Sequence, residues 1–288
     1  NVIDRTDFEV LQPAIDYYQN HGTATDKLRT HYYEGRIYQN AGQGDLAMKS
    51  FIKAREVEGP ITDTLTLGNL LVAQATYYYS TYKVKEFIAN NQQAARLYEA
   101  IGHSYYQFRS LLNTLDGSIL NNDKPLADSI LTCCRSEIEK HPDYEASLLS
   151  YILSYTITFG SDEEIRTAIE SCLDKKNLSR NAKLKMALGY SKIGEAEKAL
   201  QIFAEASPSN SLSYLAIQMQ VLKSNEKYKE ALDAYQSYSN TLEKKHLDIF
   251  SQDLLFAQEK HDLKMASLKE TQTKEKLIWY STCSTFAL

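Results

Sequence analysis

The chain has 288 residues, of which 43% are apolar, and it contains only 11 glycines and 5 prolines. This apolar content is enough for a continuous core, and the scarcity of hairpin-forming residues argues against an all-β fold. The net charge is −5 and no basic block stands out, so the electrostatic footprint of a duplex-binding protein is absent.

The sequence is organised in pairs of helical segments. Residues 28–61 predict two antiparallel helices, the first from near Asp26 to a turn at 41–44 and the second from Asp45 to about Val57, before a Gly-Pro stop. We expect residues 1–25 to form a partial repeat. Further pairs follow near residues 62–104, 108–141, 146–179, 180–211 and 212–244.

A recurring spacing of small and large residues explains why such pairs should stack. A small residue is expected where the two helices of a pair cross, and large residues fill the space to the next pair. The small positions are Ala47, Ala127, Ala199 and Ala231, and the large ones include Tyr38, Phe51, Tyr190 and Phe203. One pair cannot bury its apolar face alone, so the sequence predicts an all-α stack of antiparallel pairs with a curved inner wall.

Residue spacing alone leaves two possible registers for the helix pair within residues 62–104. One frame begins near Gly68 and places the turn at 81–83, and the other begins near Ala75. The first frame is preferred because it allows Thr64 to Ser80 to form one complete helix.

The C-terminal part predicts one long helix over residues 245–288, since no glycine or proline follows Thr241. Its first half is expected to cap the stack. Its polar later half is a candidate stalk or coiled-coil strand that would pair two copies of the chain. Residues 277–288 are mostly uncharged, but a spanning helix needs roughly 20 residues. They are either the start of a truncated membrane span or a terminal helix packed on the last pair.

Chemistry-bearing motifs are missing from the sequence. The four cysteines, Cys133, Cys134, Cys172 and Cys283, have no metal-ligand spacing and are interpreted as buried small apolar residues. The histidines form no paired-ligand motif, and no nucleophile elbow or phosphate loop is present. We therefore expect no catalysis, no cofactor and no metal.

The frames Gly35/Tyr38/Ala47/Phe51/Ala54 and Tyr190/Gly194/Ala199/Phe203/Ala206 resemble those of tetratricopeptide repeat (TPR) proteins. The resemblance covers about residues 28–244 and implies a right-handed superhelical solenoid. Its departures are His31, Leu111, Leu149 or Lys183 where an aromatic residue is expected, and several spacings longer than the family repeat.

A narrower resemblance involves the run AIDYYQNHGTATDKLRTHYYEGRIYQNAGQGDLAMKSFIKA, which looks like the opening of bacterial envelope TPR proteins. It implies a periplasmic, inner-membrane-anchored sensor or scaffold in signalling that binds a protein or peptide. The membrane would be reached through the C-terminal helix, and nucleic acid would not be bound by this segment. A cytosolic TPR regulator that binds a peptide or a transcription factor is the alternative. A helical-repeat glycan- or nutrient-binding protein is a further one.

In the TPR frame the first helix of each pair lines the concave face. We therefore expect a partner to contact polar and aromatic side chains on these helices, with Arg36 and Arg109 as bidentate carboxylate ligands and the tyrosines as amphipathic contact area. The expected contact residues are Arg29, Tyr32, Tyr33, Arg36, Gln39, Asn69, Thr76, Tyr79, Arg109, Asn113, Asp116, Tyr151 and Ser154.

Overall fold

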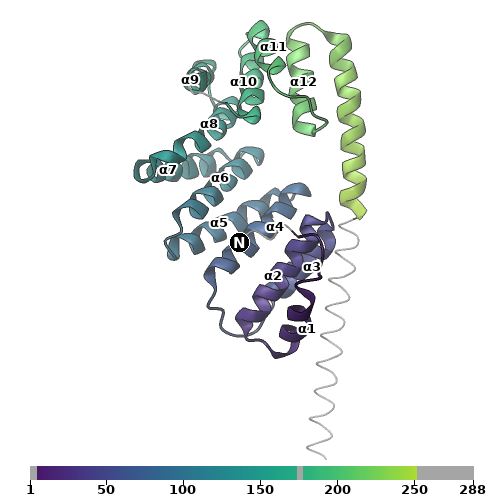
Figure 1. The fold of residues 1–288 in the computed structure, drawn as a ribbon. Helices are drawn as coiled ribbons and strands as arrows, with labels where there is room; N and C mark the ends of the chain where they lie inside the picture. Colours follow the sequence, from purple (N-terminus) through teal and green to yellow (C-terminus); the bar gives the residue numbers. More distant parts are fainter. Residues whose placement is uncertain (1–4, 174–177, 252–288) are drawn as a thin grey trace, which may run out of the picture. The chain divides into compact units, whose positions relative to one another are not determined.

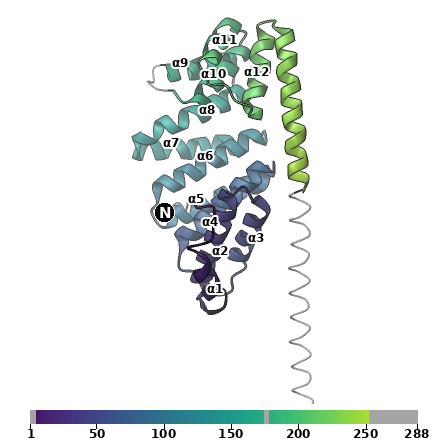
Figure 2. The same ribbon diagram turned by 45° about the vertical axis from the view of Figure 1, so that its right-hand side comes forward.

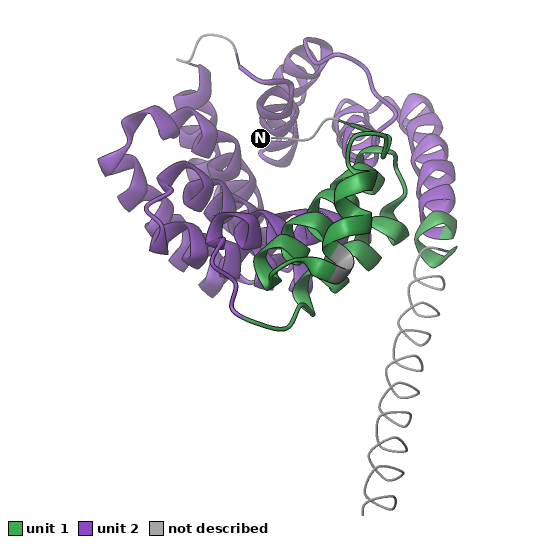
Figure 3. Cartoon of the chain, turned by 60° about the horizontal axis from the view of Figure 1, so that its bottom comes forward, with its two compact units in different colours: residues 1–59, 247–288 green, residues 60–246 purple. Residues whose placement is uncertain are grey.

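The computed structural model describes residues 5–173 and 178–251 of the chain. Every regular element in these ranges is a helix, and consecutive helices pack in antiparallel pairs (Figure 1). The chain forms two compact units, one of residues 1–59 with 247–288 and one of residues 60–246 (Figure 3). The prediction of an all-α protein built from sequential helix pairs is therefore confirmed.

The first unit contains α1 (Gln12–His21), α2 (Ala24–Asn40) and α3 (Gly44–Arg55). The helix α2 begins at a capping box, in which the Thr23 side chain accepts from the Asp26 amide and the Asp26 carboxylate accepts from the Thr23 amide. It therefore starts two residues before the expected position. The second helix begins one residue early and ends at Arg55, short of Val57.

The closest approach in the first unit lies between α2 and α3. A Cβ atom added at Gly35 would stand 2.4 Å from Cε1 of Phe51 and 3.0 Å from the Ala47 carbonyl oxygen. Phe51 and Ala54 are fully buried at this crossing, and Ala47 is 1% exposed. The small and large positions of the sequence frame thus meet as expected in this pair, because only a hydrogen atom fits between the helices.

The second unit begins with four helices of equal length, α4 (Thr64–Ser80), α5 (Val84–Ala100), α6 (Ser104–Leu120) and α7 (Lys124–Lys140). The bounds of α4 are those expected from the preferred register. A 3-10 turn, η1 (Pro142–Tyr144), leads into the later helices. These are α8 (Glu145–Phe159), α9 (Asp162–Leu173), α10 (Arg180–Lys192), α11 (Ala196–Ala204) and α12 (Leu212–Ser224).

The first three pairs share a period of 40 residues. Their first helices begin at Ala24, Thr64 and Ser104, and their second helices begin at Gly44, Val84 and Lys124. The turn within each pair places one residue in the left-handed region, at Gly42 (φ 75°), Tyr82 (φ 58°) and Asn122 (φ 54°). In the pair expected near residues 108–141, the first helix begins at Ser104, directly after the turn residue His103.

The C-terminal helix is present, and its described part covers residues 228–251. No break separates the second helix of the last pair from the long helix expected after Thr241. Within the second unit, the ammonium of Lys245 on this helix lies 4.6 Å from the ring centroid of Tyr82, at the turn between α4 and α5. The expected stalk and the apolar run 277–288 lie outside the described residues.

Candidate functional site on the first-helix face

The helices α4, α6, α8 and α10 are the first helices of their pairs, and we call the surface that they share the first-helix face. Figure 2 shows α8 between α6 and α10, and α8 packs against both. Helices from different pairs therefore meet on this face. The second unit carries eight of the expected contact residues, all on this row of helices: Asn69, Thr76, Tyr79, Arg109, Asn113, Asp116, Tyr151 and Ser154.

Four side chains, one from each helix, form the central group of this face. Tyr79 comes from α4, Asp116 from α6, Tyr151 from α8 and Lys185 from α10. We call this group the Asp116–Lys185 cluster. Three of its members were expected from the sequence, and the structure brings them together although they are separated by more than 30 residues in the chain.

Lys185 is fixed against α8 by two contacts. Its ammonium donates a hydrogen bond to the backbone oxygen of Ser150 at 3.1 Å, and it lies 5.3 Å from the ring centroid of Tyr151. Burial lowers the pKa of this lysine, and the nearby Asp116 charge opposes that effect. The ammonium is therefore held in a position where water solvates it poorly.

Asp116 faces the same desolvation. Burial raises the pKa of its carboxyl group, while the charge of Lys185 and a hydrogen bond donated by the Tyr79 hydroxyl act in the opposite direction. Asp116 and Lys185 attract each other, yet these two described residues form no direct ion pair. Each charge is thus only partly compensated by the protein.

The same environment raises the pKa values of the two tyrosines, Tyr79 and Tyr151. Burial, the Asp116 charge and the hydrogen bond to it raise the pKa of Tyr79 to about 12. Burial and the Asp116 charge also raise the pKa of Tyr151, against the influence of Arg109. Both hydroxyls therefore stay protonated at neutral pH and remain hydrogen-bond donors.

The other expected contact residues of the second unit do not belong to the Asp116–Lys185 cluster. Asn113 donates to Asn91 Oδ1 at 3.0 Å, and Asn69 Oδ1 accepts from the Tyr98 hydroxyl at 2.8 Å, so both amides serve contacts between helices. Arg109 is exposed beside the Tyr105 ring. The hydroxyl groups of Thr76 and Ser154 donate to carbonyl oxygens one turn back in their own helices.

The five expected residues of α2 belong to the first unit. Tyr32 is 8% exposed and packs beside Phe51, so its ring contributes to the core more than to a surface. Arg36 carries a buried Nε atom without a hydrogen-bond partner among the described residues. Arg29 is exposed, and Tyr33 and Gln39 are half-buried.

Sequence reasoning missed Lys185. It lies in the run Lys183-Leu184-Lys185-Met186-Ala187, where the apolar neighbours are buried and the lysines are partly buried. Continuing the row of first-helix positions from α8 to α10 would have included it. Its partners could not have been found in this way, because the contact with Ser150 depends on how α8 and α10 pack.

The cysteine interpretation is correct for two of the described residues and wrong for one. Cys134 and Cys172 are buried, whereas Cys133 is exposed. Adjacent residues on a helix point about 100° apart, so α7 directs Cys134 into the core and Cys133 away from it. Burial raises the pKa of the Cys134 thiol to about 12. Cys283 lies outside the described residues.

The described part of the chain holds no group of three or more His, Cys, Asp or Glu side chains arranged for a metal ion. None of its helices combines the length and apolar character that a bilayer crossing requires.

Comparison with known proteins identifies no family. No family model matches the chain, and no curated protein is significantly similar to it.

Proposed function

We propose that the chain is a non-catalytic scaffold of the TPR type, a right-handed superhelix that binds a protein or peptide segment on its first-helix face. The observation that carries the proposal is the Asp116–Lys185 cluster, in which two opposite charges are desolvated without touching. A partner that supplies a hydrogen-bond acceptor to Lys185 and a donor to Asp116 would satisfy both.

The energetics favour binding over a structural role for this cluster. A desolvated charge costs free energy unless it is paired, and a direct ion pair would offset more of that cost. The cluster instead keeps Lys185 on a backbone oxygen and Asp116 on a tyrosine hydroxyl. Perturbed ionisable groups on an accessible face are typical of functional sites.

The TPR assignment is supported by the packing within pairs. Glycine is in close contact with an aromatic ring at Gly35 and Phe51, and again at Gly68 and Tyr98, where an added Cβ atom would meet the ring at 2.8 Å. The departure is the 40-residue period of the first three pairs, which is longer than the TPR repeat of about 34 residues. The five helices α2 and α4 to α7 have 17 residues each, which accounts for much of the extra length.

The cellular setting is proposed from the resemblance of residues 14–54 to bacterial envelope TPR proteins. In that setting the chain is the extracytoplasmic sensor region of a membrane-anchored regulator, and its C-terminal helix leads to the membrane or pairs with a second copy. A cytosolic regulator with the same binding face is the second candidate. Expression of the full-length gene product followed by cell fractionation separates the two.

The binding proposal is tested with a random 12-residue peptide library displayed on phage. Selected peptides are measured against the wild-type chain and against Lys185→Met, Asp116→Asn and Lys183→Met. Lys183 is the matched control, because it lies on the same helix but pairs with Glu205 at 2.7 Å. We expect the two cluster variants to weaken binding about tenfold or more, as loss of a hydrogen bond to a charged group does, and the control to leave it unchanged. Failure to enrich any peptide, or enriched peptides that tolerate both cluster variants, would refute the proposal.

A further inference from the structure

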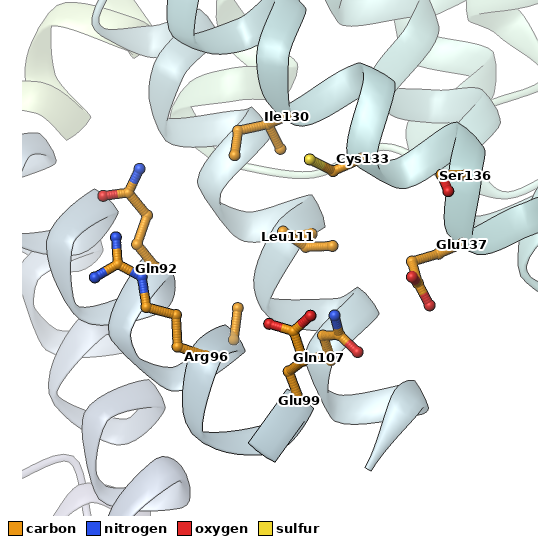
Figure 4. A pocket seen from close by; sticks show the side chains of 10 residues that line it. Gln92, Arg96, Glu99, Gln107, Leu111, Ile130, Cys133, Ser136 and Glu137 are labelled. Atoms are coloured by element: carbon orange, nitrogen blue, oxygen red, sulfur yellow. The ribbon is translucent and has the colours of Figure 1, made fainter. Parts of the chain in front are cut away.

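A separate hollow lies on the side of the second unit formed by α5, α6 and α7. It has a volume of about 310 Å³ and is lined by ten side chains, nine of which are labelled in Figure 4. Its apolar part is made by Ala95, Leu111 and Ile130. We call it the α5–α7 groove. It shares no residue with the Asp116–Lys185 cluster.

The two walls of the groove are equally long. Gln92 and Glu99 mark its extent on α5, and Ile130 and Glu137 mark it on α7, a separation of seven residues in each case. At a rise of 1.5 Å per residue this corresponds to about 10 Å, the length of roughly three residues of extended chain.

The groove carries one basic and two acidic side chains, with Arg96 and Glu99 on α5 and Glu137 on α7. Figure 4 places Arg96 on one side of Leu111 and Glu137 on the other. Arg96 is exposed, and it forms neither an ion pair nor a hydrogen bond within the described part of the chain. Its guanidinium is therefore available to an acidic group of a ligand.

Two acidic side chains mark one end of the groove, at positions that the helix dipole makes unfavourable for a negative charge. Glu99 and Glu137 both lie in the last turns of their helices, where the helix dipole disfavours a negative charge. Glu137 is only 8% exposed. Its partner is Lys140, whose ammonium is 2.7 Å away on a largely exposed side chain that can turn outward. This end of the groove therefore suits a cationic group.

We propose that the α5–α7 groove binds a short extended segment of a partner protein, in which an apolar residue is flanked by one acidic and one basic residue. The apolar side chain lies over Leu111 and Ile130. The acidic side chain pairs with Arg96, and the basic side chain pairs with Glu99 and Glu137. The proposal is independent of the function proposed for the first-helix face.

Cys133 provides the test, because it is exposed and lines the groove. In a Cys283→Ser background, the chain is equilibrated under mild reduction with four tripeptides, Asp-Leu-Lys, Asp-Leu-Gln, Gln-Leu-Lys and Gln-Leu-Gln. Each peptide carries a mixed disulfide with cysteamine, so attack of the Cys133 thiolate on this disulfide attaches the peptide and releases cysteamine. Intact mass then gives the amount of each peptide held as a disulfide at Cys133. We expect Asp-Leu-Lys to be captured about fivefold more than Gln-Leu-Gln, as two partly exposed ion pairs allow.

Two variants assign the preference to the groove. Arg96→Gln should abolish the advantage of aspartate alone, and Glu137→Gln should abolish the advantage of lysine alone, with thermal unfolding confirming that both variants fold. Arg135→Gln on α7 serves as a control, since Arg135 does not line the groove. Equal capture of all four peptides, or a preference that survives both groove variants, overturns the proposal. If Glu137→Gln unfolds, the test is the Arg96→Gln variant, and an advantage of aspartate that survives this substitution overturns the proposal.

Discussion

Lys185 and Tyr151 come from neighbouring first helices, and the ammonium lies 5.3 Å from the centre of the ring. The contact orients the lysine along the first-helix face, where it also donates to the Ser150 carbonyl and attracts Asp116. Arranged in this way, the lysine and the carboxylate each retain capacity for a partner.

The Asp116–Lys185 cluster should cost the folded chain stability at neutral pH. Burial raises the pKa of Asp116, so the stabilising contribution of this group is complete at low pH and is lost as the pH rises through the folded-state pKa. Asp116→Asn should therefore leave the melting temperature unchanged or higher at pH 7. Its advantage over the wild type should shrink as the pH falls toward 4, as measured by calorimetry.

The lysine of the cluster allows the complementary experiment. Burial lowers its pKa, so the penalty applies while the ammonium is charged, which includes pH 7. Lys185→Met should keep or raise the melting temperature while peptide binding falls. A loss of stability in both variants would instead assign the cluster a structural role.

Gly35 should not tolerate a methyl group. The added Cβ atom would stand 2.4 Å from Phe51, whose side chain is fully buried and cannot move aside cheaply. Gly35→Ala should destabilise the fold by about 1–3 kcal/mol, the usual effect of overpacking, despite the better helix propensity of alanine. Urea denaturation measures this. Gly42→Ala is a useful contrast, since no atom lies near its Cβ position but its φ of 75° penalises alanine through the backbone.

Two adjacent asparagines on α5 should respond differently to substitution. Asn91 is fully buried, donates to the Phe87 carbonyl at 2.8 Å and accepts from Asn113 at 3.0 Å. Asn91→Ala should cost about 2 kcal/mol, because it leaves the Asn113 donor without this partner. Asn90 is also buried, but its Nδ2 atom has no partner among the described residues. Asn90→Ala should be milder by about 1 kcal/mol in the same denaturation assay, and equal costs would contradict the assigned hydrogen bonds.

The N-cap of α4 depends on one carboxylate. Asp63 accepts hydrogen bonds from the Thr66 amide at 2.9 Å and from the Thr66 hydroxyl at 2.7 Å. Asp63→Ala should destabilise the fold by about 1 kcal/mol, whereas Asp63→Asn should retain most of the stability. Thermal unfolding of the two variants side by side tests this, and the asparagine variant separates capping geometry from charge.

The sequence by itself determined the helical class, the pairing of the helices and much of the first-helix row. These properties follow from local signals. Thr64 to Ser80 contains no proline, and Gly35, Ala47 and Phe51 have the spacing that a close crossing needs. The positions of Asp116 and Tyr151 on the first-helix face could also be predicted, because the periodicity of an α-helix fixes which of its side chains share a face.

Only the tertiary structure decided which of these side chains meet. The approach of Lys185 to Asp116 joins residues 69 positions apart, and it depends on the packing of α8 between α6 and α10. The α5–α7 groove likewise exists because two second helices stand on either side of α6. Such contacts, and the desolvation that shifts the pKa values of the cluster, arise from the packing of whole helices, which no local pattern of residues specifies.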